Sequence, residues 1–325
     1  MREIIEATDL CLANGTLNPA AVGYTRSQLH RTNLRGWGRT KRWEYWGIIT
    51  PTHVLGLTIS SLDYAGVLQV YLHDRERGEE LSQDAILPLA RGVVLPDGLP
   101  PISASASGGG LELHFTEGAG GTVLAVSSRR VAARLTVPPG GEALGVVVPW
   151  SERLFQYTLK DVARRVGGTL TVDGRTFEVD PAESWAVLDR GRGRWPYSMT
   201  WNWGAGMGTV EGAQLGLQLG GKWTDGTGAT ENALMVNGRL HHLPEELRWS
   251  YERAAPASPW RVEGERVHAT LTPFHVRHAR TEALVIASDT YQAFGHWSGW
   301  AVDDDGVTHR FEGLVGWAEE ARNRW

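Results

Sequence analysis

The 325-residue chain has little cysteine and no excess of positive charge. Its single cysteine, Cys11, excludes an intramolecular disulfide and a cysteine-based zinc site. The net charge of −5 is small, and acidic and basic residues are interspersed rather than gathered into the basic stripe of a nucleic-acid groove. We therefore expect no nucleic-acid partner.

Long apolar runs are also missing. No segment approaches the roughly 18 apolar residues of a membrane-spanning helix, so we expect no membrane span. The first residues, MREIIEATDLCLANG, lack the apolar stretch that follows a basic start in a secretory signal. These absences favour a cytoplasmic protein. They leave its oligomeric state open.

The chain contains an incomplete phosphate-binding motif. In GLQLGGKW, Gly216, Gly221 and Lys222 have the spacing of a P-loop, but Trp223 stands where a Ser or Thr would bind magnesium. The residues that follow are typical of a turn, so no helix N-terminus is expected to face a phosphate. We expect no nucleotide cofactor.

Other catalytic motifs are missing as well. The glycines in 204–208 lack the dinucleotide-binding spacing, and no strand–helix unit surrounds them. GHWSG at 295–299 is one residue out of register with the serine-hydrolase motif G-x-S-x-G. His275 and His278 are three residues apart, which places them on opposite faces of a strand. Adjacent His241 and His242 diverge for the same reason, so we predict no metal site from either pair.

What the sequence does contain is the pattern of an antiparallel β protein. Residues 111–117 alternate apolar and polar, as a half-buried strand does. Asp173-Gly174 and Asn237-Gly238 separate pairs of alternating runs and predict hairpin turns, and 303–306 predicts another. Strands do not alternate with helices, which argues against a doubly wound sheet. The predicted fold class is mostly β, with room for two barrels or sandwiches in tandem.

We predict a division of the chain where the tryptophan-rich half begins. The N-terminal domain would cover residues 1–180 and the C-terminal domain residues 181–325. Three short helices are expected, over 156–166, 181–190 and the tail 316–325. The second of these has a proline and acidic residues early, as helix starts prefer.

Tryptophan is unusually abundant, with fifteen residues against six phenylalanines and eight tyrosines. Eleven of them lie from Trp185 onward. Tryptophan is large and rigid and carries one N–H donor. Two interpretations remain open: a barrel core with its rim, or an aromatic wall around a hydrophobic or cationic molecule.

The polar segment from Trp223 to Asn232 contains two candidate acids. Glu231 directly precedes the apolar run ALMV, and Asp225 lies in a glycine-rich turn. If Glu231 points inward beside tryptophans, burial will raise its pKa and allow it to donate a proton. The alternative is that both carboxylates only cap turns.

The block RTKRWEYW at 39–46 is equally ambiguous. In a strand, Lys41, Trp43 and Tyr45 share one face and Arg42, Glu44 and Trp46 share the other. Arg42 and Glu44 beside Trp46 suggest a buried ion pair that braces a barrel. The alternative is the polar wall of a ligand cavity, with Glu44 as a reserve acid.

Several long motifs resemble a known family. GWGRTKRWEYW, the run from WNWG through LQLGGKWTDGTGATENAL, CLANGTLNPAAVGYTR and FGHWSG resemble the domain of unknown function 2804 family over nearly the whole chain. A more distant resemblance is to the lipocalin-like group of carotenoid 1,2-hydratases, AttH-type terpene cyclases and tocopherol cyclases. That resemblance implies two tandem lipocalin-like antiparallel β-barrels with few short helices. It implies no particular catalytic residue here.

Several members of the lipocalin-like group protonate an isoprenoid alkene with a carboxylic acid inside an aromatic cavity. The first hypothesis is therefore an acid-catalysed hydratase or cyclase with Glu231 or Asp225 as the acid and Glu44 in reserve. The alternatives are a non-catalytic carrier of a lipophilic molecule and a structural protein with a filled core. The predicted ligand contacts are Trp43, Trp46, Tyr197, Trp201, Asn202, Trp203, Trp223, Asn232, His296 and Trp297.

Overall fold

The computed structural model describes residues 1–283 and 286–324 and is built almost entirely from strands, which make up 64% of it. The described residues contain one short 3-10 helix, η1 (Pro19–Ala21). A small parallel pair, β1 (Thr8–Asp9) and β3 (His30–Arg31), precedes three large antiparallel sheets. No helix in the described part of the chain is long and apolar enough to cross a membrane.

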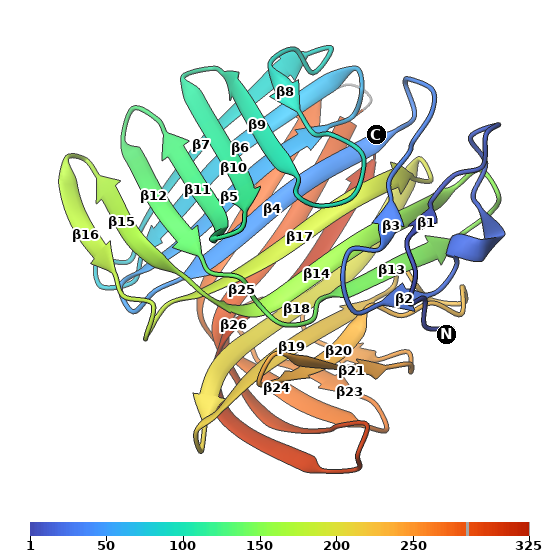
Figure 1. Ribbon diagram of the computed structural model, residues 1–325. Coiled ribbons are helices and arrows are strands. Elements are labelled where there is room, and N and C mark those ends of the chain that lie inside the picture. Colours follow the sequence, from blue (N-terminus) through green and yellow to red (C-terminus); the bar gives the residue numbers. More distant parts are fainter. Residues whose placement is uncertain (284–285, 325) are drawn as a thin grey trace.

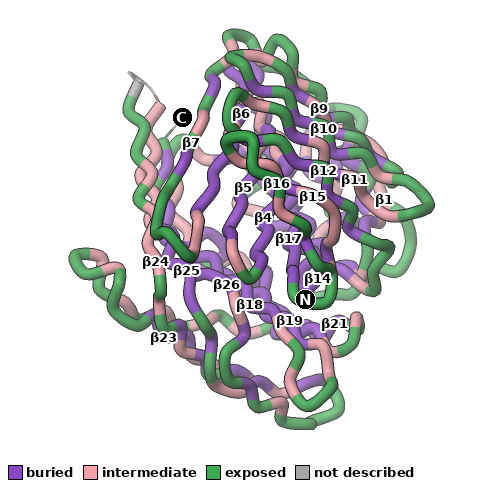
Figure 2. The backbone as a smooth tube through the Cα atoms, turned by 90° about the vertical axis from the view of Figure 1, so that its left-hand side faces the viewer, coloured by how far each residue is buried: buried purple, intermediate pink, exposed green. Residues whose placement is uncertain are grey.

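An eight-stranded sheet lies in the middle of the molecule (Figure 1). Its order is β2 (Tyr24–Thr25), β13 (Leu144–Pro149), β14 (Phe155–Arg165), β17 (Trp185–Arg194), β4 (Lys41–Ile49), β5 (His53–Ser61), β6 (Ala65–Asp74) and β7 (Glu79–Pro88). A sheet covered on both faces buries consecutive residues rather than alternate ones. Buried residues accordingly run without interruption along much of β14 and β17 (Figure 2).

A seven-stranded sheet covers one face of this central sheet. Its order is β16 (Arg175–Val179), β15 (Gly167–Val172), β12 (Val131–Val137), β11 (Gly121–Ser127), β10 (Leu111–Gly118), β9 (Ser103–Gly108) and β8 (Val93–Val94). Leu113 and Phe115 from this sheet pack with Leu57 and Val70 from the central sheet in one hydrophobic core. Together these two sheets form the N-terminal β unit.

A nine-stranded sheet covers the other face. Its order is β21 (Arg239–Leu243), β20 (Asn232–Val236), β19 (Ala213–Gly221), β18 (Ser198–Val210), β26 (Thr308–Arg324), β25 (Ile286–Val302), β24 (Val267–Ala283), β23 (Trp260–Glu263) and β22 (Arg248–Ser250). One face joins the central sheet in a second core that includes Trp203, Phe294 and Trp317. The other face curls around a third core that includes Leu217 and Trp297.

The predicted two-part lipocalin-like β fold is confirmed. The predicted hairpins are also present, with turns between β15 and β16, between β20 and β21, and between β25 and β26. The domain boundary near residue 180 stays a prediction. Beyond that boundary, β17 is hydrogen-bonded between β14 and β4 in the central sheet.

All three predicted helices are wrong. Residues 156–165 belong to β14, residues 185–190 belong to β17, and residues 316–324 belong to β26, while Trp325 lies outside the described residues. Their polar and apolar residues do not alternate because both faces of these strands are buried. β14 and β17 lie between two other sheets, and β26 lies between the central sheet and the third core. Polar side chains on those buried faces are paired with one another instead of with water.

Candidate functional site

Three residues form a row across the face of the central sheet that meets the nine-stranded sheet. Lys160 of β14 is in register with Asp189 of β17, which is in register with Tyr45 of β4. In a sheet, residues in register on neighbouring strands project from the same face about 5 Å apart. The central sheet therefore presents an ammonium, a carboxylate and a phenol side by side.

The nine-stranded sheet presents a second polar row on its facing side. Gly220 of β19 is in register with Trp203 of β18, which is in register with Glu319 of β26. The side chain of Glu231 lies over Gly220, where an added Cβ would be 2.2 Å from its Cγ. Glycine at 220 thus makes the space that Glu231 occupies.

Lys160 links the two rows. Its Nζ lies 3.1 Å from Oδ2 of Asp189 and 3.5 Å from Oε2 of Glu231. It also lies 4.1 Å from the centroid of the Trp203 ring, within cation–π range. One buried cation thus contacts a carboxyl group on each side of the layer.

Three carboxyl groups act on Lys160, and their anions are stabilised to different degrees. They belong to Asp189, Glu231 and Glu319. Asp189 accepts hydrogen bonds from the Trp43 indole at 3.0 Å and the Thr158 hydroxyl at 3.1 Å, in addition to its contact with Lys160. Glu231 accepts one hydrogen bond from the Trp223 indole, and its Oε2 has no hydrogen-bond partner among the described residues. Glu319 accepts one hydrogen bond from the Trp201 indole, so Asp189 is the best-supported anion of the three.

Burial raises the pKa of Glu231 from 4.5 to about 7, although the Lys160 ammonium and the Trp223 hydrogen bond act in the opposite direction. Burial likewise raises the pKa of Glu319 to about 7, against its 2.9 Å hydrogen bond from the Trp201 indole. Burial alone would lower the pKa of Lys160, but Asp189 and Glu231 together raise it. Near neutral pH the site therefore contains a charged lysine beside acids that can carry a proton.

Aromatic rings continue from this centre towards the surface. Trp195 stacks on Trp223 with ring centroids 5.3 Å apart and meets Trp43, Trp150 and Trp201 edge to face at 5.1–5.7 Å. The last three rings are only partly buried. The cluster is therefore a continuous aromatic path from the surface to Glu231.

The structure brings part of the predicted set together. Glu231, Trp43, Trp201, Trp203 and Trp223 all contribute to the layer between the central and nine-stranded sheets. Their catalytic and ligand-binding roles remain predictions, but their convergence on one layer makes this layer the candidate site.

The other predicted residues lie elsewhere. Asp225 is exposed, and its Oδ1 accepts the backbone N–H of Lys222. Asn232 is buried and accepts the backbone N–H of Gly220, which fixes the segment that carries Glu231. The remaining ones are outside the layer: Asn202 and Trp297 point to the other face of the nine-stranded sheet, and Tyr197 and His296 are exposed.

Glu44 and Trp46 point into the N-terminal unit, on the opposite face of the central sheet from Lys160. The expected pairing of Glu44 with Arg42 is wrong, because Glu44 pairs with Arg190 at 3.0 Å. Arg42 instead contacts Asp63 and Asp97. Strand register explains the difference, since Arg190 lies directly opposite Glu44 on the neighbouring strand.

Several site residues had not been identified from the sequence. Lys160 and Asp189 lie in segments whose pattern predicts helices, and Glu319 lies in the predicted C-terminal helix. These segments are long and do not alternate regularly between apolar and polar residues. That pattern also fits a strand that is buried on both faces. Reading 156–165 as such a strand would have placed Lys160 in a protein interior, where a lysine requires a partner.

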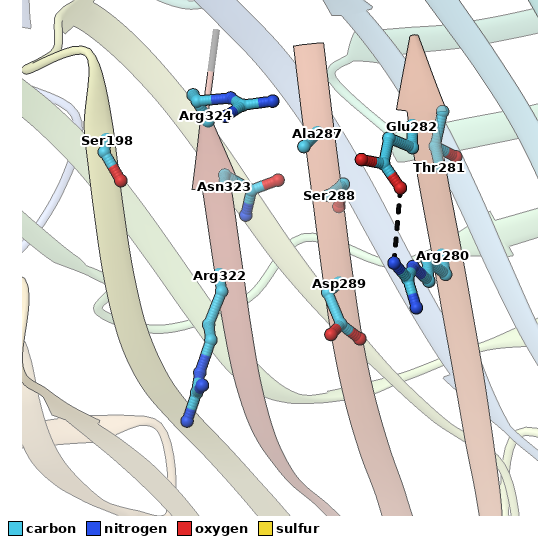
Figure 3. A pocket seen from close by; sticks show the side chains of 10 residues that line it. All are labelled: Ser198, Arg280, Thr281, Glu282, Ala287, Ser288, Asp289, Arg322, Asn323 and Arg324. Carbon is cyan, nitrogen blue, oxygen red and sulfur yellow. Dashed lines mark hydrogen bonds and ion pairs between the residues drawn. The ribbon is translucent and has the colours of Figure 1, made fainter.

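Two surface pockets lie apart from these carboxylates. One of about 270 Å³ lies at the ends of β24, β25 and β26, and the side chains that line it include Arg280, Arg322, Arg324, Asp289 and Glu282 (Figure 3). Another of about 490 Å³ lies beside the bulge in β14, between Arg164 and Gln214. Neither is lined by Glu231, Glu319 or Lys160.

Replacing Gly220 with Ala is expected to displace Glu231, because the new methyl group would overlap its side chain. We expect a loss of about 1–3 kcal/mol in the free energy of unfolding, typical of overpacking a core. Chemical denaturation measures this loss. Gly118→Ala is the control. A Cβ at Gly118 has no neighbour within 4 Å, and the residue has no positive φ, so this substitution should change stability little.

Comparison with protein families identifies the family of this chain. A family model described as domain of unknown function 2804 (DUF2804) matches residues 1–325. The chain belongs to the DUF2804 family. A comparison with curated proteins finds no significant match in sequence.

Solved structures share the fold of this DUF2804 protein at low sequence identity. A candidate AttH protein of Nitrosomonas europaea has 14% identity and a TM-score of 0.56, over 87% of this chain and 92% of its own. Kievitone hydratase of Nectria haematococca has 14% identity and a TM-score of 0.50, over 89% of each chain. CghA, solved with Sch210972, has 11% identity and a TM-score of 0.57, over 91% of this chain and 89% of its own. At these identities the likeness establishes the fold.

Proposed function

We propose that this protein binds a hydrophobic small molecule between its central and nine-stranded sheets and catalyses acid-dependent hydration or cyclisation of an isoprenoid or similar alkene. The observation that carries the proposal is Glu231, a fully buried carboxyl group with a raised pKa, next to Lys160 and an aromatic cluster. Perturbed acids in such surroundings are typical of functional sites. Kievitone hydratase, which shares the fold, is a hydratase by name.

The proposed reaction starts with proton transfer from Glu231 to one carbon of the alkene, which breaks the π bond and leaves a carbocation on the other carbon. The faces of Trp195, Trp201 and Trp223 stabilise that positive charge. In hydration, water adds to the cation and returns a proton to the Glu231 carboxylate. In cyclisation, the π electrons of a second double bond of the substrate form a C–C bond to the cation, which moves the positive charge to another carbon. The Glu231 carboxylate then takes a proton from a carbon next to that charge, which forms a new double bond and restores the acid.

We assign Lys160 and Asp189 supporting roles in this reaction. Lys160 stabilises the Glu231 anion that remains after proton transfer, since its ammonium is 3.5 Å away. Asp189 keeps Lys160 charged and in place through their 3.1 Å contact. These two are positioning residues, and Glu231 is the proposed catalytic residue.

Deuterium incorporation tests the proposal directly. In deuterium oxide, the wild-type protein should transfer deuterium to a carbon of an isoprenoid alkene such as farnesene or farnesol. Glu231→Gln keeps the shape of the side chain but removes its acidic proton, so it should bind the same compounds without incorporating deuterium. Mass spectrometry measures the incorporation, and quenching of tryptophan fluorescence measures the binding.

A matched control replaces a carboxylate outside the site. Asp225→Asn changes an exposed turn residue and should leave both readouts unchanged. Binding by wild type and Glu231→Gln without incorporation by either would favour the second candidate, a non-catalytic carrier of lipophilic molecules. That candidate is supported by the same aromatic cluster, which needs no chemistry to bind an apolar molecule.

A further inference from the structure

Two buried hydrogen-bond donors face the layer that contains Glu231 and have no partner among the described residues. They are Nε2 of Gln218, whose residue is 1% exposed, and Nε1 of Trp317, whose residue is 0% exposed. A buried donor left without an acceptor costs about 1–3 kcal/mol. Their pairing with a ligand would recover that cost.

The two donors share one row of the nine-stranded sheet. Ala205 of β18 is in register with Gln218 on one side and with Trp317 on the other. The next row along the same face contains Gly220, Trp203 and Glu319. The donors thus flank a small side chain directly beside the proposed acid site.

The orientation of the Gln218 amide is determined by its neighbour. The Trp203 indole, which can only donate, gives its hydrogen to Oε1 of Gln218 at 3.0 Å. The amide nitrogen is therefore left as the free end, and it can only donate. Trp317 is fixed as well, because its ring packs edge to face on Trp203 with centroids 5.1 Å apart.

Both side chains that flank Ala205 therefore offer an unpaired donor. Besides Gln218 and Trp317, the Lys160 ammonium lies over the Trp203 ring, and Glu231 donates when it is protonated. A pure hydrocarbon offers none of these groups an acceptor. A molecule with a carbonyl, hydroxyl or ether oxygen does.

We infer that Gln218 and Trp317 bind an oxygen atom of the substrate, so that the substrate class is an oxygenated apolar molecule rather than a hydrocarbon. This inference rests on the proposed function and specifies its substrate. Sites that hydrogen-bond a substrate oxygen discriminate strongly against analogues without it, since the protein donors are then left unpaired. The aromatic cluster holds the apolar part, and the two donors fix its orientation towards Glu231.

Farnesol and farnesene provide the test, because they share an isoprenoid chain and differ in one hydroxyl group. Dissociation constants are measured by quenching of tryptophan fluorescence for wild type, Gln218→Leu and Trp317→Phe. Each variant removes one donor and keeps most of the packing. We expect the ratio of the farnesene constant to the farnesol constant to fall about tenfold in each variant, as the loss of a buried hydrogen bond predicts.

Trp260→Phe is the matched control. Trp260 is as buried as Trp317, but its indole donates to the carbonyl of Pro256 at 2.9 Å in the third core. Its ratio should stay at the wild-type value. If Gln218→Leu does not fold, Trp317→Phe still decides the question, because it retains an aromatic ring.

The outcomes separate the inference from the proposed function. If both compounds bind and neither donor variant changes the ratio, the inference is overturned while the hydrophobic site stands. If the two donors bind a water molecule instead of the ligand, their removal leaves the ratio of the two dissociation constants unchanged. That result also overturns the inference. If wild type binds neither compound, the proposed isoprenoid function is overturned, and the inference with it.

Discussion

Replacing Lys160 with Met is expected to lower the free energy of unfolding by about 3–5 kcal/mol, the usual cost of removing one partner from a buried ion pair. Lys160 is 6% exposed and contacts both Asp189 and Glu231. The variant leaves these two carboxyl groups in the interior without their cation. Chemical denaturation near neutral pH measures the loss.

The same substitution should raise the pKa of Glu231 further above about 7, because the Lys160 ammonium normally lowers it. Lys222→Met is the matched control. Lys222 is partly exposed, and its partner Glu320 keeps hydrogen bonds from Tyr251, Arg253 and Arg322. We expect a loss of at most about 1 kcal/mol there. Equal losses for the two variants would contradict the assignment of Lys160 as the cation that joins the two sheets.

The second large effect is expected at Arg190, inside the N-terminal unit. Its guanidinium is 1% exposed and contacts Glu44 at 3.0 Å, Glu117 at 2.6 Å and Gln28 at 2.7 Å. Burial alone would lower the pKa of Arg190, but the two glutamates raise it. Arg190→Met leaves both glutamates without their cation, so we expect a loss of about 3–5 kcal/mol.

Arg130→Met is the control for Arg190. Arg130 also forms a paired contact with a carboxylate, Asp173, at 2.7 Å, but both side chains are about half exposed. Solvent screens such exposed ion pairs, so we expect little change in the free energy of unfolding. The double variant Arg190→Met, Glu44→Gln should recover part of the loss, since it removes one uncompensated charge. A loss at Arg190 no larger than at Arg130 would show that the buried network does not stabilise the fold.

The sequence predicts the local features of this fold better than the features that depend on contacts between sheets. Hairpins were predictable because Asp173-Gly174 and Asn237-Gly238 act locally, through turn geometry and the alternation of the strands beside them. The helices were mispredicted in strands that are covered on both faces, where alternation is absent. The distinction between those strands and helices depends on the sheets that cover them, which come from other parts of the chain.

The residues of the candidate site also fall into those that the sequence could predict and those that it could not. Glu231 and its neighbouring tryptophans could be proposed from the sequence, since a carboxylate between a turn and an apolar strand is unusual. Lys160, Asp189 and Glu319 could not, because they reach Glu231 only through the register of β14, β17 and β26. Glu44 is a candidate because it shares a strand face with Arg42 and Trp46, but the register of β4 and β17 pairs it with Arg190.

The central claim is that Glu231 carries a proton near neutral pH. Infrared difference spectroscopy of wild type and Glu231→Gln, between about pH 5 and pH 9, detects the protonated carboxyl group directly. We predict a carboxyl signal that titrates near pH 7 in wild type and is absent from the variant, while Glu319 contributes a signal common to both. The free energy of unfolding of wild type, relative to that of Glu231→Gln, should fall as Glu231 loses its proton. Because the folded-state pKa is raised above 4.5, the contribution of Glu231 is present below about pH 4.5 and is lost as the pH rises to about 7. Identical spectra for the two proteins across this range would contradict the claim.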